Sequence, residues 1–97
     1  VYENHASFGI LVCGTGTGMS IAANKHIGIR AASCTSEIMA QYARTDNNAN
    51  VLCIGERILE NEEDAKKIVD VFLGSEFEGG RHQDRVDKMM AMEKEGR

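Results

Sequence analysis

The sequence predicts an α/β fold with a parallel sheet and flanking helices, on three observations. An apolar run at residues 9–12 passes directly into a glycine-rich turn and then into helix-favouring residues. Strand-like and helix-like stretches then alternate three times along the chain. Strand–helix–strand units form right-handed crossovers, so such strands are expected to lie parallel in one sheet.

The first unit is the strand, loop and helix at residues 9–25. Residues 9–12 are short, apolar and unbroken, which is typical of a strand buried on both faces of a parallel sheet. Cys13 is expected to end this strand. Residues 19–25 favour a helix. The glycines between them permit backbone angles closed to other residues and let a ligand approach the main chain: Gly14, Gly16 and Gly18.

The second unit is a strand at residues 28–34 and a helix over residues 37–44. Thr35 or Ser36 can cap this helix, because a hydroxyl before the first turn accepts a hydrogen bond from its unpaired N–H groups. The helix carries an apolar stripe that consists of Ile38, Met39 and Tyr42.

The third unit begins with a polar turn at residues 45–50, followed by a buried strand at residues 51–54 that Gly55 ends. Asn61 can cap the next helix, whose first turn holds acids that complement the helix dipole. Gly74 closes this helix. Its buried face is expected to comprise Ile68, Val69, Phe72 and Leu73.

The last predicted element is a charged amphipathic helix from Arg81 to about Glu95. Its apolar side, which packs either on its own sheet or on a partner subunit, comprises Val86, Met89, Met90 and Met92. Residues 1–7 are expected to form a loop or the tail of a helix. Because three strands make a thin sheet, the first part of the domain is expected to lie outside this sequence.

Length and composition describe a single, partial domain over residues 1–97. A net charge of −4 and a pI near 5.3 give no electrostatic reason to expect a nucleic acid or an anionic membrane as partner. No run approaches the roughly 18 apolar residues of a membrane span, and no signal peptide is recognisable. The cysteines are odd in number and widely spaced, which favours reduced thiols in the cytoplasm over disulfides. The histidines show no metal-ligand spacing.

The glycine loop predicts an anion site. Its N–H groups and the positive end of the following helix converge at the carboxyl edge of the sheet, where open α/β sheets place their ligands. Cys13 would face this pocket, and the neighbouring N–H dipoles would favour its thiolate. The alternative is that Cys13 is an inert core residue and the loop a structural turn.

Two nucleotide-binding motifs fit the loop poorly. A dinucleotide site needs Gly-x-Gly-x-x-Gly and an acidic residue about 20 positions later. Here the third glycine comes one position early, and no acid follows the second strand until Glu37. A phosphate-binding Walker loop needs Lys after its last glycine, where this chain has Met19. A nucleotide-binding domain is therefore the least favoured interpretation.

Four segments together resemble type B ribose-5-phosphate isomerases, a family that includes the galactose-6-phosphate isomerase subunits. They occur in the family's order and at similar spacing, and they comprise residues 9–25, residues 47–52, the turn at residues 55–57, and residues 77–82 with Arg85. The resemblance implies a Rossmann-like α/β fold and an aldose–ketose isomerase that needs no metal or nucleotide. It also implies a homodimer or homotetramer whose active sites lie between subunits, with the helix in residues 79–97 reaching the neighbouring subunit.

The resemblance also implies the roles of individual residues. Cys13 matches the cysteine that moves a proton between C1 and C2 through an enediolate, and Thr15 offers a hydroxyl to the substrate. The amides of Gly14, Gly16 and Gly18 would stabilise the enediolate oxygen. Residues that would contact substrate oxygens or phosphate are Asn47, Arg57, Arg81 and Arg85. On local grounds, Asn47 is equally well explained as a helix-end residue, and arginines four apart can simply be solvated.

Two departures from the family leave a second hypothesis open. Asp46 stands where many members have the histidine that helps to open the sugar ring, so ring opening would use Asp46 or another group. The family's N-terminal segment, which ends in an Asp-His pair, is absent from this sequence. Both departures would also fit a non-catalytic sugar-phosphate-binding subunit of a hetero-oligomer. His82, beside the presumed phosphate arginines, is a further candidate source of charge.

Overall fold

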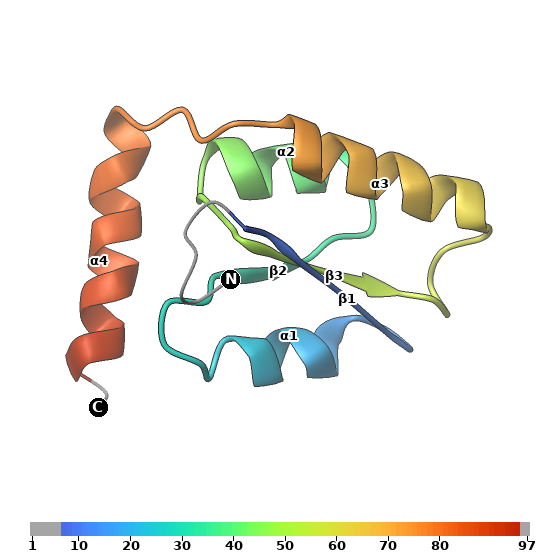
Figure 1. The fold of residues 1–97 in the computed structure, drawn as a ribbon, viewed down its shortest axis with the longest axis horizontal. Helices are drawn as coiled ribbons and strands as arrows, with labels where there is room; N and C mark the ends of the chain where they lie inside the picture. Colours follow the sequence, from blue (N-terminus) through green and yellow to red (C-terminus); the bar gives the residue numbers. More distant parts are fainter. Residues whose placement is uncertain (1–6, 96–97) are drawn as a thin grey trace.

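The computed structural model describes residues 7–95, and its elements form a sheet with helices on both faces (Figure 1). Of the predicted N-terminal stretch, residues 1–6 lie outside the described residues, as do residues 96–97 of the C-terminal segment. The elements in chain order are β1 (Gly9–Cys13), α1 (Thr17–Ala23), β2 (Ala31–Ser33), α2 (Glu37–Thr45), β3 (Val51–Gly55), α3 (Glu62–Gly74) and α4 (Arg81–Glu95).

The sheet has three parallel strands in the order β1-β3-β2. Val51 of β3 pairs with Gly9 of β1 on one side and with Ala31 of β2 on the other. Helix α1 covers one face, and α2 and α3 lie together on the opposite face (Figure 1). The predicted α/β fold with a parallel sheet and flanking helices is therefore confirmed.

The core lies between the central strand and the α2–α3 layer. All five residues of β3 are buried, and Leu52 packs in one cluster with Ile68 and Phe72. The middle strand is covered on both faces, which accounts for its continuous apolar sequence.

Strand β1 does not share this burial, so the prediction that it is buried on both faces is wrong for the described residues. The side chains of Ile10 and Val12 are 37% and 58% exposed. They line an open groove of about 520 Å³ together with Leu59 and Val69. Helix α3 packs over β3, and within residues 7–95 no element covers the same face of β1.

Strand β2 is shorter than predicted, because side chains supply most of the hydrogen bonds just before it, beside a backbone bond from Asn50 N to Arg30 O (2.9 Å). Asn50 accepts a hydrogen bond from Arg30 N (2.7 Å) and donates one to Gly28 O (2.9 Å). Asn24 bonds both the N–H and the C=O of Ala31. The extended pairing therefore begins only at Ala31 and not at residue 28.

Both predicted helix caps of the α2–α3 layer are confirmed. Ser36 Oγ accepts a hydrogen bond from Met39 N (3.3 Å), and Asn61 Oδ1 accepts one from Asp64 N (2.9 Å). The buried face of α3 includes Ile68 and Phe72, but Leu73 is 49% exposed, so its predicted burial is wrong.

The apolar stripe of α2 is exposed, and the helix buries small residues instead. Ile38, Met39 and Tyr42 are all at least 44% exposed, whereas Ala40 and Ala43 are buried. Small side chains let α2 approach its neighbours closely, and this leaves the larger apolar residues on the outer side.

Arg44, at the end of α2, is buried and fixes the turn that follows. Its Nη1 donates to Asn48 Oδ1 (2.9 Å) and to Ala49 O (2.8 Å), and its guanidinium lies 4.6 Å from the centre of the Phe8 ring. Asn48 has a φ of 50°, in the left-handed region. The polar turn is thus held in one conformation from within the fold.

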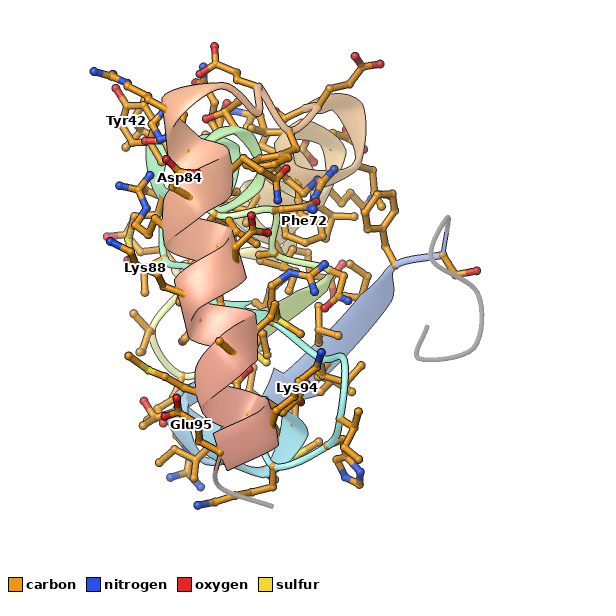
Figure 2. All side chains as sticks on the ribbon, turned by 90° about the vertical axis from the view of Figure 1, so that its left-hand side faces the viewer. Tyr42, Phe72, Asp84, Lys88, Lys94 and Glu95 are labelled. Atoms are coloured by element: carbon orange, nitrogen blue, oxygen red, sulfur yellow. The ribbon has the colours of Figure 1, made fainter. Side chains whose placement is uncertain are left out.

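Helix α4 stands across the amino-terminal edge of the sheet, and Figure 2 shows it in front of the other elements. Its Glu93 accepts a hydrogen bond from Gly28 N (2.8 Å), and Val86 is 3% exposed. Met89 and Met92 stay 38% and 67% exposed. The helix therefore rests on its own chain with one face and presents methionines on another. Within the described residues, no helix combines the length and the apolar character that a bilayer crossing requires.

Candidate active site

The predicted site residues fall into two groups at opposite edges of the sheet. Cys13 ends β1 and pairs with Gly55 at the carboxyl end of β3. Asp46 and Asn47 precede β3, so they lie at its amino end. A five-residue strand spans roughly 13–17 Å. One chain therefore does not bring Cys13 to Asp46 or to the arginines of α4.

At the carboxyl edge, we name the residues Cys13, Gly14, Thr15, Gly16 and Arg57 the carboxyl-edge cluster. At the amino edge, the structure places Glu78, which was not predicted, beside Asp46, His82 and Arg85, and we name these four the amino-edge cluster.

The loop of the carboxyl-edge cluster is shaped by Gly16. Its φ is 84°, and it is the N-cap residue of α1. A Cβ atom at Gly16 would lie 2.7 Å from Ser33 Oγ, so the chain conformation and the space both require glycine. Gly14 and Gly18 do not adopt a positive φ, so the predicted use of this freedom holds at Gly16 alone.

Substitution of Gly16 by alanine is expected to lower the free energy of unfolding by about 1–3 kcal/mol, because it forces an L-residue into the left-handed region and against Ser33. Gly18→Ala is the matched control, since a Cβ atom there meets nothing within 4 Å. Denaturant unfolding of both variants measures the difference. Equal stability of the two variants would contradict this account of the loop.

The sulfur of Cys13 lies among backbone donors. Gly16 N donates to Cys13 Sγ over 3.1 Å. The backbone N–H of Met19, and after it those of Gly16 and Thr15, lower the pKa of the Cys13 thiol, against partial desolvation and the nearby charge of Glu56. The loop thus favours the reactive thiolate, as predicted.

The other two cysteines behave differently. Both are buried, and burial raises the pKa of Cys34 to about 11 and also raises the pKa of Cys53. Of the three cysteines, Cys13 is the one whose surroundings favour the thiolate, the form that can accept a proton.

Arg57 and Thr15 complete the carboxyl-edge cluster. Arg57 N donates to Gly14 O (2.8 Å), and its side chain lies against Gly14, with Nε 3.2 Å from the position of a Cβ there. Thr15 is exposed, and its hydroxyl accepts a hydrogen bond from Thr17 N at 3.4 Å. A guanidinium and a hydroxyl therefore border the glycine loop that follows Cys13.

The amino-edge cluster joins the turn before β3 to the start of α4. Arg85 Nη2 donates to the backbone O of Asp46 (3.1 Å) and contacts His82 Nδ1. The other ring nitrogen, His82 Nε2, lies 3.6 Å from Asp46 Oδ1 and 3.9 Å from Glu78 Oε1. The sequence indicated His82 only as a source of charge. Glu78 lies in the segment 77–82 that carries the family resemblance, but nothing in the sequence pointed to its proximity to His82.

Arg81 and Asn47 flank this cluster. Arg81 is exposed as the first residue of α4, after Gly79 and Gly80, whose φ values of 67° and 52° turn the chain into the helix. Asn47 lines a groove of about 1060 Å³ between α4 and α2, which Tyr42 and Met89 also line. Because the Arg81 side chain is exposed, its guanidinium is accessible to an anion in solution.

The ligand atoms of Asp46, Glu78 and His82 lie within 4.8 Å of one another, which is close enough to surround a cation. However, the guanidinium of Arg85 contacts Nδ1 of the same imidazole and donates to the backbone O of Asp46 (3.1 Å), so a fixed positive charge already borders these ligand atoms. A further cation would be repelled by that charge, and the arrangement disfavours a metal site.

Comparison with known proteins adds independent findings. Residues 1–89 match the family described as Ribose/Galactose Isomerase. The chain is 54% identical over 85 residues to ribose-5-phosphate isomerase B of Escherichia coli, and the match covers 88% of this chain and 56% of that protein. It is 51% identical over 81 residues to D-erythrulose-4-phosphate isomerase of Pectobacterium atrosepticum, with coverage of 84% and 53%.

A solved structure, that of Mycoplasma genitalium ribose-5-phosphate isomerase B with bound ribulose-5-phosphate, superposes with a TM-score of 0.87 at 52% identity. The match covers 91% of this chain and 57% of that one. The chain thus spans little more than half the length of these relatives.

Proposed function

Because this chain belongs to the ribose/galactose isomerase family, we propose that it is part of an aldose–ketose isomerase that interconverts ribose 5-phosphate and ribulose 5-phosphate. The observation that carries the proposal is the environment of Cys13, where backbone donors lower the pKa of an accessible thiol. The relatives named as isomerases of phosphorylated sugars support the substrate class.

In the proposed reaction, the Cys13 thiolate removes the proton from C2 of the open-chain aldose. The electron pair moves through C1 onto the carbonyl oxygen, which becomes negative, and the enediolate forms. The amides of Gly14, Gly16 and Gly18 stabilise its negative oxygen, and the Thr15 hydroxyl contacts the sugar. The Cys13 thiol then returns the proton to C1, and the proton of the C2 hydroxyl passes to the C1 oxygen. C2 thereby becomes the carbonyl carbon of the ketose, and the proposed steps use no cofactor or metal.

A complete site is proposed to need two copies of the protein. Since Cys13 and the amino-edge cluster lie at opposite edges of one sheet, the cysteine of one copy would act with Asp46, Asn47, Arg81 and Arg85 of another. The two α4 arginines and Arg57 would then hold the phosphate, for which guanidinium groups are suited. A homodimer or homotetramer in the cytoplasm, with α4 contacting the neighbouring subunit, fits this proposal.

The protein expressed from its complete coding sequence is expected to convert ribose 5-phosphate, and ketose formation measures this directly. Allose 6-phosphate and galactose 6-phosphate assayed in parallel report the preferred sugar. Binding of sugar phosphate without turnover of any of the three would contradict the isomerase and support the non-catalytic subunit, which Asp46 in place of the family histidine favours.

A further inference from the structure

Gly55 ends β3 at the point where the glycine loop lies against this strand. The residue is buried and pairs with Cys13 in the sheet, and its φ is not in the left-handed region. Residues with a side chain adopt such strand angles freely. The conformation of the chain therefore does not explain why this position carries glycine.

The space beside Gly55 is filled by the backbone of Thr15. A Cβ atom at Gly55 would lie 2.4 Å from the carbonyl carbon of Thr15, 2.5 Å from its oxygen and 2.6 Å from its Cα. Carbon atoms in contact are ordinarily about 3.5–4.0 Å apart. Since all three neighbours are backbone atoms, no side chain can turn aside, and the loop itself would have to move by about 1 Å.

The loop that packs on Gly55 carries a donor to the Cys13 sulfur. Gly16 N, which follows Thr15 directly, donates to Cys13 Sγ over 3.1 Å. On the other side of Gly55, Glu56 N donates to Cys13 O (2.8 Å). The end of β3 therefore holds the start of the loop by a hydrogen bond and its middle by close packing.

The groups around the sulfur act in two directions. The N–H groups of the loop and of the first turn of α1, that of Met19 foremost, lower the pKa of the Cys13 thiol, whereas desolvation and the charge of Glu56 raise it. Burial and the charge of Cys13 raise the pKa of Cys53. The side chain of Arg57 lies against the start of the loop, and α1 carries no ionisable side chain. The thiolate therefore depends on where the loop places its N–H groups.

Resting on the proposed isomerase function, we propose that Gly55 is a positioning residue for the reaction. Because it has no side chain, Thr15 packs directly on the end of β3, and the N–H groups of the loop are held at the Cys13 sulfur and at the oxygen of the enediolate. Gly55 thus acts on the reaction through the loop.

Gly55→Ala tests the proposal in the protein expressed from its complete coding sequence. Alkylation by iodoacetamide is followed over a range of pH, and peptide mass spectrometry reports each cysteine separately. In the variant, the alkylation midpoint of Cys13 is expected to move to higher pH and its rate near neutral pH to fall several-fold, because displaced donors no longer favour the thiolate. Cys34 is buried and should stay unreactive, which shows that the variant is folded.

The same variant is expected to lose roughly 100-fold in kcat/KM for ribose 5-phosphate, the cost that a displacement of about 1 Å can have in an active site. Gly74→Ala is the matched control, since it makes the same change at a glycine where a Cβ atom meets nothing within 4 Å. The Cys13 alkylation profile and the kcat/KM of this control should equal those of the parent.

An unchanged Cys13 profile in Gly55→Ala, or a kcat/KM within a few fold of the parent, would overturn the role of Gly55. A variant in which Cys34 reacts as fast as Cys13 would overturn it too, because Gly55 would then serve the fold as a whole. A parent protein that converts no sugar phosphate would overturn the proposed function instead. The alkylation profile would still decide whether Gly55 holds the loop at Cys13.

Discussion

Replacement of Cys13 by alanine is expected to lower kcat/KM for ribose 5-phosphate by about 10²- to 10⁴-fold, the usual contribution of a general base. No other described thiol can replace it, because Cys34 and Cys53 are buried and their pKa values are raised. Steady-state kinetics of the protein expressed from its complete coding sequence measure the effect.

Cys34→Ala is the matched control, because it removes a thiol from the core and leaves the loop intact. The folded fraction of this variant should keep kcat/KM within a few fold of the parent. In the parent, kcat/KM should rise with pH as Cys13 loses its proton and level off below the pH expected for an ordinary thiol, because the loop amides lower the pKa of Cys13. Turnover by Cys13→Ala close to that of the parent would refute the assigned role.

The sequence predicted best those features that depend on neighbouring residues. The caps Ser36 and Asn61 were found because capping needs only a side-chain acceptor three residues before a backbone N–H. The family resemblance was likewise carried by local motifs, and the family match confirms it. The same holds for α4, whose bounds at Arg81 and Glu95 agree with the prediction.

Burial could not be predicted in the same way, because it depends on which elements cover a surface. Ile10 and Val12 have the sequence of a buried strand but lie where no element of residues 7–95 covers them. On α2, periodicity identified the apolar stripe as the buried face. The helix instead buries Ala40 and Ala43, whose small side chains let it lie close to the neighbouring elements.

The separation of the site into two clusters follows from chain order rather than from any motif. In a parallel sheet, residues that follow a strand lie at the carboxyl edge, and residues between a helix and the next strand lie at the amino edge. Cys13 belongs to the first kind and Asp46 to the second. The contacts of His82 depend on how α4 packs, which no local pattern reports.

Mixing two inactive variants is therefore expected to restore activity. Cys13→Ala lacks the proposed base, and the double variant Arg81→Ala, Arg85→Ala lacks the α4 arginines, so each alone should lose at least about 100-fold in kcat/KM. In a twofold-symmetric dimer, each mixed pair contains one site with both intact halves. Co-refolding equal amounts should thus recover roughly a quarter of the parent's activity, measured with ribose 5-phosphate.

The reciprocal mixture distinguishes a shared site from a site within one chain. A variant with all three substitutions, mixed equally with the parent, leaves every mixed dimer without an intact site if each site draws on both copies. Activity should then fall to roughly a quarter of that of the same total amount of parent, whereas sites contained in single chains would leave roughly half. Because Cys13 and Arg85 lie at opposite edges of one sheet, we expect the activity of this mixture to be roughly a quarter of that of the parent. An activity of roughly half would place the reaction within one chain and contradict the two-copy site.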